Sequence, residues 1–264
     1  MLFCADIGNT TISLGVFEGE QLRFTSRIAA ARERSVDEYA ITLQAIFRMY
    51  GTDPKKVEGA ALSSVVKPLS PVFAAAVEKV CGVPSLLLGP GVRTGLNIKI
   101  DSPAQLGADL AANCVAAQAL VPPPLAVLDL GTATTLTVID GKGVLTGVMI
   151  CPGVQSGLEA LSDLAAELPA ISLEEPKALL GKNTVDSMNS GVIFGAAAMV
   201  DGLLARISEQ CRGEDLSVVV TGGLAETILP YCRTKMLSEP NLALLGLKRV
   251  FELNRRKHAA VSTS

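Results

Sequence analysis

The chain has 264 residues, of which 49% are hydrophobic and 19% charged, enough apolar material for one large domain or two moderate ones. Its 23 basic and 26 acidic side chains leave a net charge of −3 with no long run of either sign. This balance argues against a nucleic-acid-binding protein and against a polybasic membrane anchor. The single histidine, His258, lies near the C-terminus, so neither a Ser-His-Asp triad nor a histidine-based zinc site is expected.

The six cysteines are at least 21 residues apart and form no C-x-x-C motif. Most of them have apolar neighbours, which is typical of buried thiols in a reducing compartment. The N-terminus shows no signal peptide, and the most apolar stretch, residues 111–128, is interrupted by prolines at 122–124. We therefore expect a cytoplasmic protein that does not span a membrane.

Two segments, 123 positions apart, resemble one another. The first runs from Leu2 to Thr11 and continues to a turn at residues 18–20, and the second runs from 126 to 135 and continues to a turn at 140–142. Each predicts a strand ending in Asp-x-Gly, a hydroxyl-rich turn, a second strand and a hairpin turn. The spacing is close to half the chain, so the pattern predicts a duplicated domain.

The rest of the chain predicts helices that alternate with strands. The expected helices span residues 41–50, 71–80 and 107–119, and the expected buried strands span 57–66 and 218–220. Such alternation favours mixed α/β sheets flanked by helices, and two halves of this kind would leave an interdomain cleft. The prolines at 122–124 mark a linker, so we expect an N-terminal domain at 1–120, a C-terminal domain at 121–255 and a tail at 256–264.

Asp6 and Asp129 are each predicted at the end of a strand, beside a turn of small residues. Glycine lets a phosphate approach the backbone, and the N–H groups of the turn can donate hydrogen bonds to its negatively charged oxygens. If the halves face each other, a cation that bridges substrate phosphates would offset the repulsion between the two carboxylates. Alternatively, each aspartate caps its own hairpin turn. Two copies, together with Thr221-Gly222-Gly223, favour the phosphate site, although the common nucleotide motifs are absent.

Eight motifs, in one order, resemble the type III pantothenate kinases. They are Asp6-Ile-Gly-Asn-Thr10, Asp37-Glu-Tyr39, Ser63-Ser-Val-Val66, Gly107-Ala-Asp109, Asp129-Leu-Gly-Thr132, Pro152-Gly153, Gly181-Lys-Asn-Thr184 and Thr221-Gly-Gly223. The resemblance implies two RNase H-like domains of the actin-like ATPase superfamily, and a homodimer. It also implies phosphorylation of pantothenate to 4'-phosphopantothenate, the first step of coenzyme A synthesis. The implied cofactors are ATP, Mg²⁺ or another divalent cation, and K⁺ or NH₄⁺.

The resemblance also implies roles for individual residues. The first ATP phosphate loop matches Asp6, Ile7, Gly8, Asn9, Thr10, Thr11, Ile12 and Ser13, and Thr132 matches a further ATP contact. Asp109 matches the proton acceptor for the pantothenate hydroxyl, Asp129 matches the monovalent-cation ligand, and Asp6 is the other expected metal ligand. The substrate site would include Gly107, Ala108, Leu110, Ile100 and Thr184, the last reaching across the dimer. From the residues alone, Asp109 could equally be a helix N-terminal charge and Thr184 a helix N-cap.

Two positions depart from the family pattern. Leu110 stands where the family's Gly-x-Asp-Arg motif has arginine, and Ile100 stands where a tyrosine usually lines the pantothenate pocket. Loss of the arginine removes a forked partner for a carboxylate, worth about 1.5–3 kcal/mol. This leaves two alternatives open: a kinase for another small hydroxyl compound, and a nucleotide-binding, non-catalytic paralogue with a decayed acceptor site.

Overall fold

The structure is a computed structural model that describes residues 1–165, 167–211 and 214–261, with side chains through Arg255. The chain forms two compact units, which we describe separately. The first contains Met1–Leu96, Asp101–Ala116 and the chain from Asn241 onward, and the second contains Asn97–Ile100 and Ala117–Pro240.

The observed units differ from the expected division in three places. The C-terminal helix was expected in the second domain, but its apolar residues pack on the sheet of the first unit. Residues 97–100 were expected in the first domain, but Asn97–Ile98 adds a strand to the second sheet. The expected tail from residue 256 is helical as far as Val261.

The first sheet has five strands in the order β3-β2-β1-β4-β5. Its strands are β1 (Leu2–Ile7), β2 (Thr11–Glu18), β3 (Gln21–Ala29), β4 (Gly59–Ser64) and β5 (Ser85–Leu87). Strand β1 pairs antiparallel with β2 and parallel with β4, so it lies at the centre, between a hairpin partner and a crossover partner. The strand expected at 57–66 is therefore β4, shorter by two residues at each end.

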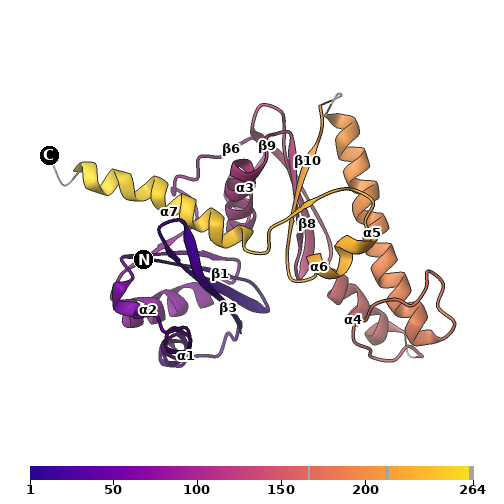
Figure 1. The fold of residues 1–264 in the computed structure, drawn as a ribbon, viewed down its shortest axis with the longest axis horizontal. Helices are drawn as coiled ribbons and strands as arrows, with labels where there is room; N and C mark the ends of the chain where they lie inside the picture. The colour runs from indigo at the N-terminus through magenta and orange to yellow at the C-terminus, as the bar shows by residue number, and fades with distance from the viewer. Residues whose placement is uncertain (166, 212–213, 262–264) are drawn as a thin grey trace. The chain divides into compact units, whose positions relative to one another are not determined.

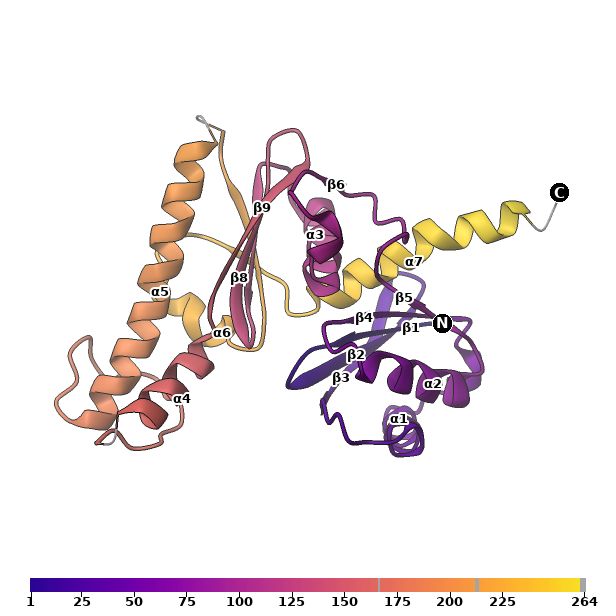
Figure 2. The same cartoon turned by 180° about the vertical axis from the view of Figure 1, so that it is seen from behind.

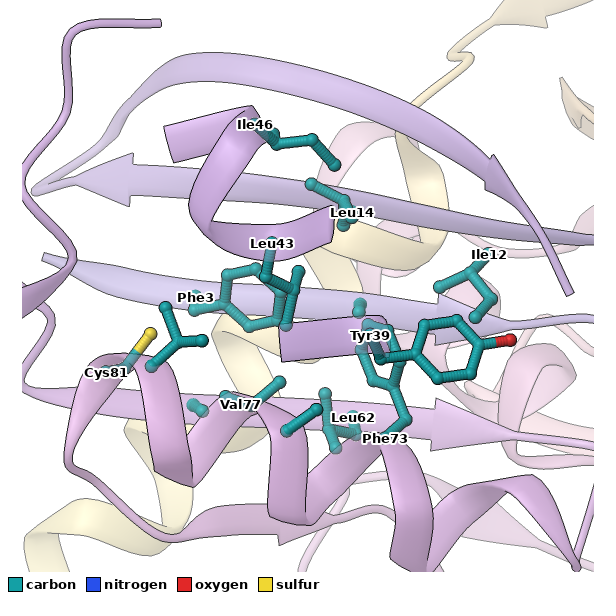
Figure 3. Packing of buried hydrophobic residues seen from close by; sticks show 14 of the residues in the cluster. Phe3, Ile12, Leu14, Tyr39, Leu43, Ile46, Leu62, Phe73, Val77 and Cys81 are labelled. Carbon is teal, nitrogen blue, oxygen red and sulfur yellow. The ribbon is translucent and has the colours of Figure 1, made fainter. Parts of the chain in front are cut away.

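One face of this sheet is covered by α1 (Val36–Met49) and α2 (Leu69–Cys81), the two helices expected near 41–50 and 71–80. Helix α1 begins before residue 41 because Ser35 and Glu38 form a capping box, in which Ser35 N–H donates to the Glu38 carboxylate at 2.7 Å. Figure 3 shows the core between sheet and helices. Its buried side chains include Phe3, Leu14, Leu43, Leu62, Phe73 and Val77.

The opposite face of the first sheet is covered by α7 (Leu242–Val261), and α3 (Ala108–Leu120) packs on α7 (Figures 1 and 2). Cys4 and Ala61 of the sheet belong to one buried cluster with Val115 of α3 and Leu247 of α7. The two helices are in close contact, because a Cβ on Gly246 would overlap the carbonyl oxygen of Ala112. This contact fixes α3, the helix expected at 107–119, on the same face of the sheet as even-numbered β1 residues such as Asp6.

The second sheet has six strands in the order β11-β10-β7-β8-β9-β6. Its strands are β6 (Asn97–Ile98), β7 (Leu125–Leu130), β8 (Ala133–Ile139), β9 (Val144–Pro152), β10 (Ser217–Thr221) and β11 (Leu237–Ser238). The helices of this unit are α4 (Val154–Leu164), α5 (Thr184–Gln210) and the short α6 (Ala225–Ile228). The strand expected at 218–220 is β10.

Helix α5 is the one helix in the described part of the chain that is long and apolar enough to cross a membrane by length and composition alone. A core helix of a soluble protein satisfies the same criterion. Ile193, Val200 and Leu204 of α5 pack in one buried cluster with Leu128 of β7 and Val220 of β10 in the second sheet. Helix α5 therefore has a packing role within its unit.

The two sheets share one topology, and this confirms the duplication expected from the sequence. Strands β9-β8-β7-β10-β11 repeat the order and directions of β3-β2-β1-β4-β5, the arrangement of the RNase H fold. Both copies also have a register shift near the far end of the second strand, at Val16/Phe17 and at Val138/Ile139. The expected fold class, two mixed sheets flanked by helices, is therefore confirmed.

Candidate functional site

In the first unit, Asp6 belongs to a row of polar residues that crosses the sheet. It pairs with Ser13 on β2 and with Ser63 on β4, and Ser13 pairs in turn with Arg27 on β3. Directly paired residues point to the same face, so all four side chains lie on the face that carries α3 and α7. The Ser63 hydroxyl donates to Asp6 Oδ1 at 2.6 Å.

The turn after Asp6 exposes the residues expected to bind phosphates. Gly8 N–H donates to the Thr11 carbonyl at 3.0 Å, which closes a tight turn, and Ala30 N–H donates to the Thr10 carbonyl at 2.9 Å. Asn9 and Thr10 are exposed at its tip. The turn therefore presents small residues and hydroxyls of the kind that anion-binding turns contain.

Two residues expected in this loop face the other way. The side chains of Ile7 and Ile12 pair across the hairpin and are fully buried in the core beneath α1 and α2. Only their backbone groups could contact a nucleotide. Their role in the structure is to fix the hairpin from which Asp6 and Ser13 project.

In the second unit, Asp129 occupies the position that corresponds to Asp6. It pairs with Thr135 on β8 and with Thr221 on β10, so it too lies between two hydroxyl-bearing residues on one face. Thr221 is buried, and the hydroxyl of Thr135 is buried without a hydrogen-bond partner among the described residues. The hydroxyl–aspartate–hydroxyl row is therefore present in both copies.

The turn after Asp129 is enclosed by other segments. A Cβ on Gly153 would overlap the carbonyl oxygen of Thr132, and Ser156 Oγ donates to the same oxygen at 3.1 Å. Gly222 has a φ of +104°, and a Cβ there would lie 2.5 Å from the Leu130 backbone. Gly153 and Gly222 thus allow close packing around the turn, Gly153 against Thr132 and Gly222 against Leu130.

Asp109 lies in the first turn of α3, in the first unit. Burial raises the pKa of the Asp109 carboxyl above its ordinary value, and hydrogen bonds from the backbone N–H groups of Leu110 and of Asp109 itself offset this only in part. Its Oδ1 is buried and has no hydrogen-bond partner among the described residues. A Cβ on Gly107 would overlap this Oδ1, so glycine leaves the space that the carboxyl occupies.

A position in the first turn is what a helix N-terminal charge requires, but such a charge needs neither burial nor an unpaired oxygen. A buried carboxyl with a raised pKa is a candidate proton acceptor. Ala108 and Leu110, on either side of Asp109, are half-buried. Ile100 belongs to the second unit, where it is half-buried after β6.

Thr184 lines a cavity of about 620 Å³ beside the start of α5. The cavity is lined by Leu161, Leu168, Gly181, Lys182, Asn183, Thr184, Ser187, Met188, Gly191 and Val192. Asn183, and not Thr184, caps α5, because its Oδ1 accepts a hydrogen bond from Asp186 N–H at 2.9 Å. The Thr184 hydroxyl is thus not needed as the helix cap.

The segment before this cavity is held by side chains that the sequence analysis did not single out. Buried Asn189 accepts a hydrogen bond from Glu174 N–H at 2.9 Å, and Ser190 Oγ donates to the Leu179 carbonyl. Ser63, Thr135 and Thr221 were likewise missed as neighbours of the aspartates. Only the equivalent strand positions in the two repeats could have indicated them.

Duplicated RNase H-like sheets, each with an aspartate at the end of its first strand, define the class of actin-like phosphotransferases and ATPases. Two solved structures have a similar fold. One is a Campylobacter jejuni protein described as a conserved putative Baf family transcriptional activator, with a TM-score of 0.59 and 18% sequence identity; the match covers 96% of this chain and 99% of that one. A ROK hexokinase from Thermus thermophilus is also similar (TM-score 0.55, 17% identity, 97% and 99%).

Sequence comparison is more specific. The family model for type III pantothenate kinase matches residues 2–206. The type III pantothenate kinase of Roseiflexus castenholzii is 41% identical over 97% of this chain and 100% of its own length. The chain belongs to the type III pantothenate kinase family.

Proposed function

We propose that the protein transfers the γ-phosphoryl group of ATP to the hydroxyl of pantothenate and forms 4'-phosphopantothenate, the first step of coenzyme A synthesis. The observation that carries the proposal is Asp109. The resemblance to the family motif implies that this carboxylate acts as a base. This role is supported by its buried Oδ1, which has no hydrogen-bond partner among the described residues, and by its raised pKa. A cytoplasmic location agrees with six free cysteines in the described chain.

In the proposed reaction, the pantothenate hydroxyl oxygen attacks the γ-phosphorus. The bond between the γ-phosphorus and the β,γ-bridging oxygen breaks, and ADP is released. Asp109 accepts the hydroxyl proton. In the first unit, the Gly8–Thr11 turn and Ser13 supply N–H and hydroxyl donors to the phosphates. Such transfer depends mainly on positioning and on charge neutralisation, which suits a site built from turns and one base.

The residues present fit a divalent cation held jointly with phosphates. The described residues contain no cluster of three or more histidine, cysteine, aspartate or glutamate side chains able to hold a metal ion. Mg²⁺ is commonly bound through one or two carboxylates together with substrate phosphates, and Asp6 can supply such a carboxylate. When bound, the ion would neutralise charge on the transferring phosphates.

A monovalent cation, K⁺ or NH₄⁺, is proposed at Asp129. Thr135 is paired with Asp129 across the strands, and its Oγ1 is buried without a hydrogen-bond partner among the described residues. This oxygen could coordinate K⁺ or accept a hydrogen bond from NH₄⁺.

We also propose that two copies associate through the face formed by α4 and the segment before α5. Leu164 and Leu180 on this face are 86% and 81% exposed, and Leu161 and Leu179 are exposed beside them. Clustered exposed leucines mark an interaction surface. In such a homodimer, Thr184 would contact the substrate bound to the partner subunit.

The test measures ADP release by purified protein with ATP, Mg²⁺ and K⁺, with and without pantothenate. We expect pantothenate-dependent release that stops in Asp109→Asn and needs K⁺ or NH₄⁺ in place of Na⁺. Mass spectrometry should identify 4'-phosphopantothenate. Absence of pantothenate-dependent release from folded protein would contradict the proposal, and tight ATP binding with no turnover of any acceptor would favour a non-catalytic nucleotide-binding protein.

Leu110 and Ile100 favour a second candidate, a kinase for a less anionic hydroxyl compound. Both residues are aliphatic and half-buried where the family pattern has polar side chains. The double variant Leu110→Arg with Ile100→Tyr separates the two candidates. A drop of about tenfold or more in the KM for pantothenate would show that this chain's own pocket suits another acceptor, whereas an unchanged or higher KM would support pantothenate.

A further inference from the structure

Ser63 is a buried hydroxyl whose hydrogen bond goes to an aspartate of the proposed nucleotide site. Its side chain is 0% exposed, and its Oγ donates to Asp6 Oδ1 at 2.6 Å. The bond joins adjacent parallel strands at their carboxyl ends, where Asp6 and Ser63 are directly paired. A short hydrogen bond from a buried hydroxyl to a half-buried carboxylate is of the strong, charge-assisted type.

The next residue on the same strand has a different role. Ser64 Oγ donates to the Val66 carbonyl at 3.2 Å and accepts from Val66 N–H at 3.1 Å, so it stabilises its own turn. Successive side chains of a strand point to opposite faces, which places Ser63 with Asp6 and Ser64 away from it. The chain thus provides two adjacent serines of which only one has its hydroxyl on Asp6.

The second repeat has a hydroxyl at the same place. Thr221 on β10 is directly paired with Asp129 and is only 5% exposed. Strands β4 and β10 correspond in the duplicated topology, so each copy has a buried hydroxyl beside the aspartate of its first strand. The sequences of the two strands otherwise differ, Gly59-Ala-Ala-Leu-Ser-Ser64 against Ser217-Val-Val-Val-Thr221. The hydroxyl recurs where most of the surrounding strand has changed.

We propose that Ser63 is a positioning residue for the phosphoryl-transfer reaction: it orients the Asp6 carboxylate toward the divalent cation and the nucleotide phosphates. The inference rests on the proposed function, in which Asp6 supplies that carboxylate. The bond to Oδ1 restricts rotation of the carboxylate about its terminal torsion, which is otherwise broad. A preorganised carboxylate needs no reordering when Mg·ATP binds, and this favours affinity.

The experiment compares Ser63→Ala with Ser64→Ala as the matched control and with Ser63→Thr as the conservative variant, since threonine is the residue of the second repeat. Affinity for Mg²⁺ with a non-hydrolysable ATP analogue is measured by calorimetry, and KM values are measured for Mg·ATP and for pantothenate. We expect Ser63→Ala to bind Mg·nucleotide about tenfold more weakly, with the KM for pantothenate unchanged. Ser64→Ala should bind like the wild type, and Ser63→Thr should recover most of the affinity.

Equal nucleotide affinities in Ser63→Ala and Ser64→Ala would overturn the inference. If Ser63→Ala fails to fold, as circular dichroism would show, Ser63→Thr decides alone: retained affinity supports the inference and lost affinity in a folded protein overturns it. Wild-type protein that binds Mg·nucleotide without phosphorylating pantothenate would end the proposed function, and the binding data would still decide the role of Ser63. Wild-type protein that does not bind Mg·nucleotide at all would overturn both.

Discussion

The two repeats have the same aspartate at the same strand position but build the following turn in different ways. In the first unit the turn is closed by its own backbone bond from Gly8 to Thr11, and its tip is exposed. In the second unit Gly153 and Gly222, from distant parts of the chain, pack directly against the turn. Duplication has preserved the carboxylate and its hydroxyl neighbours, while the first turn depends on local bonds and the second on tertiary packing.

The two units also differ in how their helices cover the sheet. The first sheet has apolar helices on both faces, α1 and α2 on one and α3 and α7 on the other. In the second unit, α5 covers the sheet, but the α4 face leaves several leucines exposed. Both units expose some apolar side chains, such as Ile41 and Met49 in the first, but the most exposed leucines, Leu164 and Leu180, lie in the second.

The largest effect on stability is expected at the packed turn, from Gly222→Ala. The substitution places a side chain at a φ of +104° and drives its Cβ into the Leu130 backbone. Backbone strain and overpacking together should cost about 3 kcal/mol. Gly223→Ala is the matched control, since a Cβ there would meet nothing within 4 Å. Thermal melting should show a much lower Tm for Gly222→Ala alone, and equal Tm values would mean that the second turn is no more constrained than the first.

The next effect concerns Asp109, the proposed base in the first unit. Asp109→Asn should lower kcat by about 10²–10⁴-fold, because it removes the proposed proton acceptor. Asp101→Asn, an exposed aspartate nearby, should retain activity. Full activity of Asp109→Asn would remove Asp109 from the mechanism.

The same variant has a predicted pH signature in stability. Burial raises the folded-state pKa of Asp109 above the ordinary value of 3.8, so the carboxyl favours the folded state below that value and this contribution is lost as the pH rises through the folded-state pKa. At about pH 7 the buried charge is therefore destabilising. Asp109→Asn should have a higher Tm than the wild type at about pH 7, and the difference should shrink toward about pH 4. A difference that does not change with pH would contradict the burial of this charge.

The sequence allowed more of the first unit to be predicted than of the second. The two repeats were visible because strand pattern and turn residues are local signals, and Asp6 and Asp129 were found from them. The neighbours Ser63 and Thr221 depend on which strands pair, and no local pattern encodes that. The packing of α7 on the first sheet also depends on a tertiary contact, at Gly246, which leaves no periodic signal.

The burial of Ile7 and Ile12 shows a limit of motif matching. They belong to a loop motif, yet strand alternation turns their side chains into the core while Asp6 and Ser13 face the other way. A motif locates a segment, and the pleat decides which of its side chains can reach a ligand.

The exposed leucines of the second unit provide a test of the proposed dimer contact, with an effect of intermediate size. Leu164→Glu and Leu180→Glu should shift the protein from two copies to one, as measured by light scattering, because each would bury a charge in the proposed contact. Dimer affinity should fall about thirtyfold or more. Ile41→Glu is the matched control in the first unit, where Ile41 is 66% exposed on α1. Equal dimerisation in all three variants would assign the contact to another surface.

The smallest effect is expected at the helix caps, of which each unit has a clear example. Ser35 caps α1 in the first unit, and Asn183 caps α5 in the second, so Ser35→Ala and Asn183→Ala should each cost about 1 kcal/mol. Asn183 also lines the cavity beside Thr184, whereas Ser35 does not. If the cavity is part of the acceptor site, Asn183→Ala should raise the KM for pantothenate, although it lowers the Tm no more than Ser35→Ala does. Asn183→Ser retains a capping oxygen and should restore the Tm. Equal KM values in both alanine variants would restrict Asn183 to its role in the helix and would place the acceptor elsewhere.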